Sequence, residues 1–183
     1  MPKIDTLKTI AGAHGGFANA NRFTLDLSLP LGVLQALRKK NVAFDKQHIE
    51  MLCESVTIPG KQLESFDYST YRNPIKMPNG YINDEVNISF LLTEDMFIKK
   101  IFDTWQEYIL DPITYQLRYR KDYITDANIY TLDKKNVQKN RTRLVDCFPI
   151  TVGGFEKSSE STDTLSKLQV TLACNNILRN EQI

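Results

Sequence analysis

Residues 85–109 constrain the fold more than any other stretch, because they read as a half-buried strand that runs directly into an amphipathic helix. Residues 86–92 alternate with a period of two, which is typical of a strand with one buried face. The apolar positions of this pattern are Val86, Ile88, Phe90 and Leu92. A strand of this kind belongs in a sheet whose apolar face is covered by another layer.

The helix that follows has its own apolar face and defined ends. At about 100° per residue, one narrow arc contains Ile98, Ile101, Phe102, Trp105, Tyr108 and Ile109. We expect Ile98, Ile101, Phe102 and Trp105 to form the core contact of this helix. Thr93 is placed to cap the first turn, where the acids Glu94 and Asp95 suit the helix dipole. Asp111-Pro112 ends the helix, because a residue before proline avoids helical geometry.

The rest of the chain consists mainly of strand patterns. Alternation predicts strands at residues 23–29, 51–58, 113–119, 127–132, 144–150 and 168–174, with an exposed basic turn at 134–143 and a polar loop at 156–164. Many strands with a single strong helix favour a mainly β fold, an antiparallel β-barrel or sandwich with one flanking α-helix. We expect one domain spanning residues 1–183, with a flexible N-terminal arm at 1–22 and a C-terminal tail at 176–183.

Two connections are longer than a turn requires. Residues 31–50 have a helical, basic pattern in which Val33, Leu34 and Leu37 share a face, and they fit either a solvated connection or a partner-binding insertion. Residues 61–81 are predicted to be a long irregular loop, because prolines and an Asn-Gly pair interrupt any period. Such loops are often functional. Its exposed apolar side chains would need a partner surface, and the candidates are Phe66, Tyr68, Tyr71, Ile75 and Met77.

Composition and charge argue against several classes of function. The net charge of +1 gives no overall attraction to nucleic acid or to an anionic membrane surface. No apolar run approaches the roughly 20 residues of a membrane span, and the first residues lack the apolar core of a signal peptide. Cys53, Cys147 and Cys174 are odd in number and far apart, which indicates reduced, buried thiols in a cytosolic product.

No catalytic residue, metal site or cofactor is predicted. His14 and His48 have no cysteine or acid at metal-ligand spacing. The sequence lacks both a phosphate-binding glycine loop followed by Lys-Ser/Thr and the Gly-x-Ser-x-Gly turn of a hydrolase. The cations of residues 118–121, interleaved with tyrosines, fit either a nucleic-acid surface or an ordinary half-exposed strand. A monomeric nucleic-acid-binding β-barrel is therefore an alternative to a non-enzymatic structural domain.

Four short stretches, taken in order, carry a resemblance to a known family. Asn21-Arg22-Phe23 leads into a strand, and residues 54–60 (ESVTIPG) form a strand that ends in a Pro-Gly turn. Residues 85–105 form the strand and helix with the tryptophan, and residues 147–153 (CFPITVG) precede a polar loop and a last strand. In order and spacing, these stretches resemble the tail tube proteins of contractile-tailed, T-even-like bacteriophages, over most of residues 21–176.

The resemblance implies a tube-type β-barrel flanked by a helix. Subunits of that family join sheets side by side into six-membered rings, and the rings stack into the inner tail tube, the conduit for DNA ejection. The implied partners are further copies of the chain, the tail sheath, and the baseplate and tail-terminator proteins. Genomic DNA is implied to pass through the lumen without tight binding. The implied location is the virion tail, assembled in the host cytoplasm.

Within such a tube, the 61–81 loop is expected to reach the neighbouring ring. The polar strand positions Asn87, Ser89, Gln169 and Thr171 are candidates for the lumen wall, or else ordinary solvent-facing positions. The 31–50 connection and the 176–183 tail exceed what a plain tube subunit needs. A baseplate tube-initiator or adaptor ring is therefore the alternative to the main tube.

Overall fold

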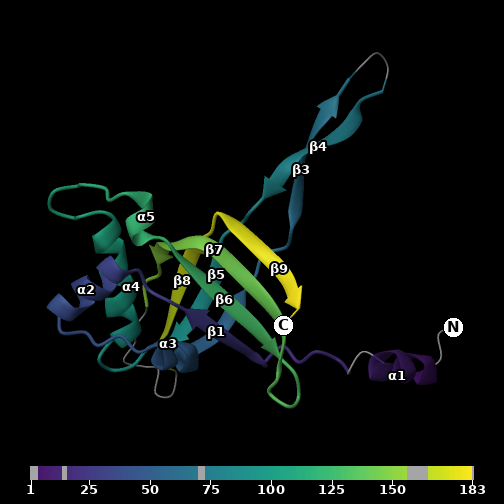
Figure 1. The fold of residues 1–183 in the computed structure, drawn as a ribbon, viewed down its shortest axis with the longest axis horizontal. Coiled ribbons are helices and arrows are strands. Elements are labelled where there is room, and N and C mark those ends of the chain that lie inside the picture. The colour runs from purple at the N-terminus through teal and green to yellow at the C-terminus, as the bar shows by residue number, and fades with distance from the viewer. Residues whose placement is uncertain (1–3, 14–15, 70–72, 156–164, 183) are drawn as a thin grey trace.

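The structure is a computed structural model that describes residues 4–13, 16–69, 73–155 and 165–182. It forms a layered body from which a β-hairpin and an N-terminal helix extend (Figure 1). The elements in chain order are α1 (Ile4–Ala13), β1 (Phe23–Leu27), α2 (Leu31–Lys39), α3 (Lys46–Leu52), β2 (Cys53–Thr57), β3 (Gln62–Tyr68), β4 (Ile75–Ile82), β5 (Val86–Leu91), α4 (Phe97–Ile109), α5 (Arg120–Tyr123), β6 (Thr125–Leu132), β7 (Gln138–Val152), β8 (Lys167–Ala173) and β9 (Asn176–Gln182).

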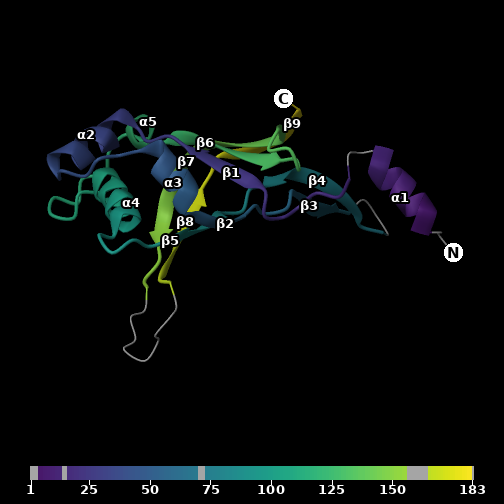
Figure 2. The same ribbon diagram turned by 90° about the horizontal axis from the view of Figure 1, so that it is seen from below.

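The body is an antiparallel sandwich whose two layers share one long strand. The strand order is β1-β6-β7-β8-β5-β2, and β9 also pairs with β7. The first half of β7 pairs with β6 and β9, and its second half pairs with β8. Between the halves, Asp146 has left-handed backbone geometry with φ of 54°, as expected where a bulge bends a strand. The bend lets β7 leave the layer of β1, β6 and β9 and enter the layer of β8, β5 and β2 (Figure 2).

This architecture confirms the prediction of a mainly β, antiparallel sandwich, but it has more helices than the single one expected. α3 contacts both β1 and β2, the outermost strands of the two layers, and so covers the open side of the sandwich. α2 packs on α4. The 31–50 connection is therefore part of the core rather than a solvated link, because Val33, Leu37 and Ile49 are fully buried.

The core lies between the two layers and under α4. Every second residue of β5 and β8 is buried, namely Val86, Ile88, Phe90, Leu168, Val170 and Leu172. On α4, Ile98, Ile101, Phe102 and Trp105 are also fully buried. The Phe102 ring lies 5.4 Å from that of Phe90 and 6.2 Å from that of Trp105. The Trp105 Nε1–H donates to the Tyr123 carbonyl at 2.9 Å, which ties α4 to α5.

The start of α4 differs from the prediction. The helix begins at Phe97, three residues later than a cap at Thr93 would place it, because residues 93–96 form a turn that ends with Met96 in left-handed geometry. Thr93 Oγ1 and Asp95 Oδ1 both accept from the Phe97 amide, at 3.4 and 3.3 Å. These side chains still satisfy the first free amide of the helix, but from outside its first turn.

Both chain ends contain regular structure that the sequence did not predict. Within the arm at 1–22, α1 forms a helix with no buried residue. Most of the tail at 176–183 is strand β9, which pairs with residues 140–145 of β7. The predicted turn at 134–143 is shorter, since β7 already begins at Gln138. The polar loop at 156–164 lies outside the described residues.

Candidate assembly surfaces

β3 and β4 form a two-stranded antiparallel hairpin that protrudes from the body (Figure 1). The prediction of an irregular loop here is wrong. Pairing extends from Gln62–Ile82 at the base to Tyr68–Ile75 near the tip, with a register shift beside Pro78. A bulge accommodates a proline, which has no amide hydrogen to donate to a ladder. The same bulge breaks the two-residue period of β4, which hides the strand in the sequence.

One face of this hairpin carries the apolar residues that the sequence singled out. Phe66 lies opposite Met77, and Tyr68 lies opposite Ile75. Cross-strand partners, and residues two apart on a strand, share a face, so the four side chains form one patch. Each is between 41% and 57% exposed. Tyr71, the fifth candidate, lies outside the described residues. We call the four described residues the apolar hairpin face.

A second surface covers the outer side of the layer formed by β2, β5 and β8. Asn87 lies opposite Thr171, and Ser89 lies opposite Gln169. The Thr171 hydroxyl donates to Asn87 Oδ1 at 2.8 Å. Pairing with β2 extends both rows, because Thr57 lies opposite Asn87 and Ser55 lies opposite Ser89. The hydroxyl–amide face is therefore Ser55, Thr57, Asn87, Ser89, Gln169 and Thr171.

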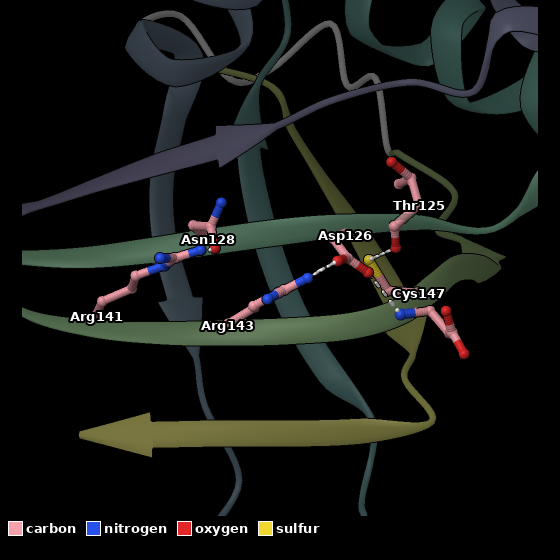
Figure 3. A network of polar contacts seen from close by, with 7 residues as sticks. Thr125, Asp126, Asn128, Arg141, Arg143 and Cys147 are labelled. Carbon is pink, nitrogen blue, oxygen red and sulfur yellow. Dashed lines mark hydrogen bonds and ion pairs between the residues drawn. The ribbon is translucent and has the colours of Figure 1, made fainter. Parts of the chain in front are cut away.

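The outer side of the other layer has a different chemistry. There, Arg143 donates to Asp126 Oδ2 at 2.6 Å, and Arg141 donates to Asn128 at 3.0 Å (Figure 3). The Asp146 amide at the bend of β7 donates to Asp126 Oδ1 at 3.0 Å. Partial burial raises the pKa of Asp126, but the bonds from Arg143 and Asp146 and the charge of Arg141 outweigh it and lower the pKa overall. We call this the charged face.

A fourth surface is the segment between α4 and α5, where the predicted strand at 113–119 is wrong. Asp111 Oδ1 accepts from the amides of Ile113 at 2.8 Å and Thr114 at 3.2 Å, which turns the chain directly after α4. A single bridge between Leu110 and Leu117 closes the loop. Its large side chains are between 68% and 86% exposed, and they are Ile113, Tyr115, Leu117 and Tyr119.

The described residues contain neither a metal-binding cluster nor a membrane-spanning helix. Within the described residues, no three His, Cys, Asp or Glu side chains gather closely enough to hold a metal ion. Of the described helices, none has the length and apolar character needed to cross a membrane. The four surfaces described above are two apolar and two polar.

Comparison with known proteins identifies the family. The sequence model described as phage tail tube protein matches residues 18–176. The chain belongs to the phage tail tube protein family. No curated protein is significantly similar to this tail tube protein in sequence.

Solved structures agree with the fold of this tail tube protein. It is similar to a chain of the sheath–tube complex of an extracellular contractile injection system (PVC) in the extended state, with a TM-score of 0.65 and 14% identity over 100% of both chains. It is also similar to the tube-terminating cap of the anti-feeding prophage, with a TM-score of 0.64 and 14% identity over 90% of this chain and 91% of that one. A third likeness is to the PVC sheath/tube terminator, with a TM-score of 0.62 and 15% identity over 88% and 95% of the two chains.

Sequence reasoning about this tail tube protein found some surface residues and missed others. It named four residues of the hydroxyl–amide face, and the structure pairs them two by two. Ser55 and Thr57 were missed, although they alternate with Val56 within β2 and that period was a usable signal. The charged face was missed because its members come from β6 and β7, whose pairing cannot be read from either strand alone.

Proposed function

We propose that this tail tube protein forms six-membered rings that stack into the inner tube of a contractile phage tail, the conduit for DNA ejection. The observation that carries the proposal is the apolar hairpin face. An isolated two-stranded hairpin is marginally stable in water. This hairpin extends from the body (Figure 1), and the four large apolar side chains of its apolar face are exposed. A partner that covers the patch would stabilise it, and in a stack that partner is the neighbouring ring.

Removing the hairpin tests ring stacking. Deletion of residues 64–78 should leave folded monomers or single rings in negative-stain electron microscopy and in mass measurements. A milder version compares Phe66→Ser on the apolar hairpin face with Lys76→Ser, which lies opposite Asp67 on the other face. Only the first should shorten or abolish tubes. Full-length tubes from the deletion variant would refute the proposed ring contact.

The hydroxyl–amide face is the proposed lumen wall. A surface that DNA slides past should avoid neutralising phosphates, because each such contact adds affinity. The six residues of this face are uncharged. Lys167 at its margin is paired with Glu54, so the two side chains together carry no net charge. The charged face, which carries Arg141 and Arg143, would then point outward. The alternative is that Asn87, Ser89, Gln169 and Thr171 are ordinary solvent-facing positions.

Accessibility to a bulky reagent tests this orientation. A cysteine introduced at Ser89 or Thr171 should react in assembled tubes only with reagents small enough to diffuse along the lumen. A cysteine at Asn128, on the charged face, should react with a bulky maleimide from outside and serves as the matched control. Reaction of the Ser89 variant with the bulky reagent would refute the lumen assignment.

The proposed partners are the sheath around the tube, the baseplate and terminator proteins at its ends, and DNA that passes without tight binding. The chain would act in the virion tail after assembly in the host cytoplasm, as a structural component rather than an enzyme. The solved relatives include chains from a sheath–tube complex, a sheath/tube terminator and a baseplate, which is consistent with these partners.

A second candidate is a baseplate ring that initiates the tube or adapts it. This candidate is supported by fold likeness to chains of a tube-terminating cap, a sheath/tube terminator and a baseplate. Their TM-scores are 0.57 to 0.64. Electron microscopy separates the two: uniform long tubes support the main tube, and single six-fold rings support the initiator or adaptor. A monomer that retains DNA at low salt would instead support a nucleic-acid-binding β-barrel.

A further inference from the structure

An apolar cleft lies between the end of α4 and the second half of β7. Six of its lining residues are Ile109, Leu110, Pro112, Tyr115, Phe148 and Ile150, and its volume is about 570 Å³. Gln106 Nε2 donates to the Ile150 carbonyl at 2.8 Å and so fixes the helix against the strand beside the cleft. We call this space the α4–β7 cleft. A cleft of this size and character is large enough for several apolar side chains.

The rim of the cleft is held in place before any partner binds. Asp111 fixes the turn through two backbone amides, and the Tyr115 amide donates back to the Asp111 carbonyl at 2.9 Å. Tyr115 has a φ of 52°, an unfavourable backbone for a bulky side chain. The Arg118 guanidinium lies over the Tyr108 ring at 4.5 Å, which attaches the far side of the loop to α4. An ordered loop that presents an exposed tyrosine in a strained backbone is typical of a contact site.

The cleft and the hairpin lie towards opposite ends of the long axis of the molecule. In both Figure 1 and Figure 2, the segment between α4 and α5 is at the left end, and β3 and β4 extend towards the right. Identical subunits that stack head to tail bring these two ends together. The chemistry also matches, because both surfaces are apolar and aromatic. Glu64 shares the face of Phe66 on β3, whereas Arg118 and Arg120 follow the cleft loop.

We propose that the apolar hairpin face of one copy binds in the α4–β7 cleft of a copy in the next ring. This inference rests on the proposed stacking function and adds the receiving site to it. The occupant is a second copy of this chain. The side chains that enter the cleft are Phe66, Tyr68, Ile75 and Met77. At the rim of the cleft, Glu64 forms an ion pair with Arg118 or Arg120.

Cross-linking between distinguishable copies tests the contact directly. A photoreactive benzoylphenylalanine replaces Tyr68 in the full chain, and assemblies are made from equal parts of ¹⁴N and ¹⁵N protein. Irradiation should give mixed-isotope cross-links to residues 109–115 or 148–150. Cross-links only within one copy, or to α1 or another surface of the neighbour, would overturn the assignment.

Assembly of cleft variants supplies the second measurement. Tyr115→Ser should raise the critical concentration for tubes roughly tenfold, because it removes an aromatic anchor from the contact. Met51→Ser, at an exposed helical position outside the cleft, should leave it unchanged. Glu64→Lys should weaken assembly, and the added Arg120→Glu should restore it. If hairpin deletion abolishes stacking but the cleft variants assemble normally, the α4–β7 cleft is not the receiving site. The proposed stacking function then still stands. If hairpin deletion has no effect, the stacking contact itself fails.

Discussion

Asp126 holds the bend of β7, and its substitution should destabilise the fold by an amount that depends on pH. Asp126→Ala removes two contacts: the ion pair with Arg143 and the hydrogen bond from the Asp146 amide. The side chains of Asp126 and Arg143 are 36% and 39% exposed, so solvent screening limits the pair to at most about 1 kcal/mol. The amide bond adds about 1 kcal/mol. We expect Asp126→Ala to lower the free energy of unfolding by about 2 kcal/mol.

Asp126→Asn separates the two contacts, because an amide oxygen still accepts from the Asp146 amide but carries no charge. We expect this variant to lose only the ion-pair part, about 0.5–1 kcal/mol. The pKa of Asp126 is lower in the folded chain than its usual 3.8. The ionic contribution is therefore complete above that value and is lost as pH falls through the folded-state pKa. The difference in the free energy of unfolding between the wild type and the Asp126→Asn variant should be constant from about pH 7 to 5 and should shrink below about pH 4.

Urea unfolding monitored by the fluorescence of Trp105, the single tryptophan, measures these differences. Protein concentration must be matched between variants, since the proposed ring assembly would add to apparent stability. Equal destabilisation by Ala and Asn would show that the amide bond contributes nothing. A difference between wild type and Asn variant that stays unchanged at pH 3 would refute the ionic account.

Two further predictions concern the core and the thiols. Phe102→Ala should lower the free energy of unfolding, measured by urea titration, by about 3–5 kcal/mol, because it leaves a cavity under Phe90. Phe66→Ala on the exposed hairpin should change the same free energy by less than about 0.5 kcal/mol. Brief alkylation at pH 8 with peptide mapping should modify Cys174 before Cys53. A hydrogen bond with Cys147 lowers the pKa of Cys174, and burial raises that of Cys53 to about 12; earlier reaction of Cys53 would contradict this.

The sequence was most informative where burial imposes a strict period. β5 and β8 alternate buried residues with half-exposed or exposed ones along their whole length, so their extent and faces were predicted closely. The apolar arc of α4 was equally clear, because all four core positions predicted on it must avoid water. In these elements the local pattern and the tertiary environment impose the same requirement, which is why single-sequence reasoning succeeded.

The sequence was misleading where an element buries little. β9 has a single buried residue among those whose burial is described, Ile177, so its alternation is weak and its pairing with β7 is decided by a distant strand. The hairpin buries almost nothing, and its bulge shifts the period. The alternation at 113–119 was real but did not make a strand, because Asp111 and Pro112 turn the chain first. The two apolar candidate surfaces fall in these regions, and in the proposed assembly their burial would come from a second chain.

The separation of core from contact surface has a consequence for tube length. The sandwich is stabilised by residues buried within one chain, whereas in the proposed contact the apolar hairpin face and the α4–β7 cleft of different chains cover one another. Two complementary ends on opposite sides of one subunit make a head-to-tail contact that never closes, so such a stack has no intrinsic length. Length must then be set by a chain that offers one end surface without the other. Under this proposal, a chain that terminates the stack needs only the cleft or only the hairpin on an otherwise similar sandwich.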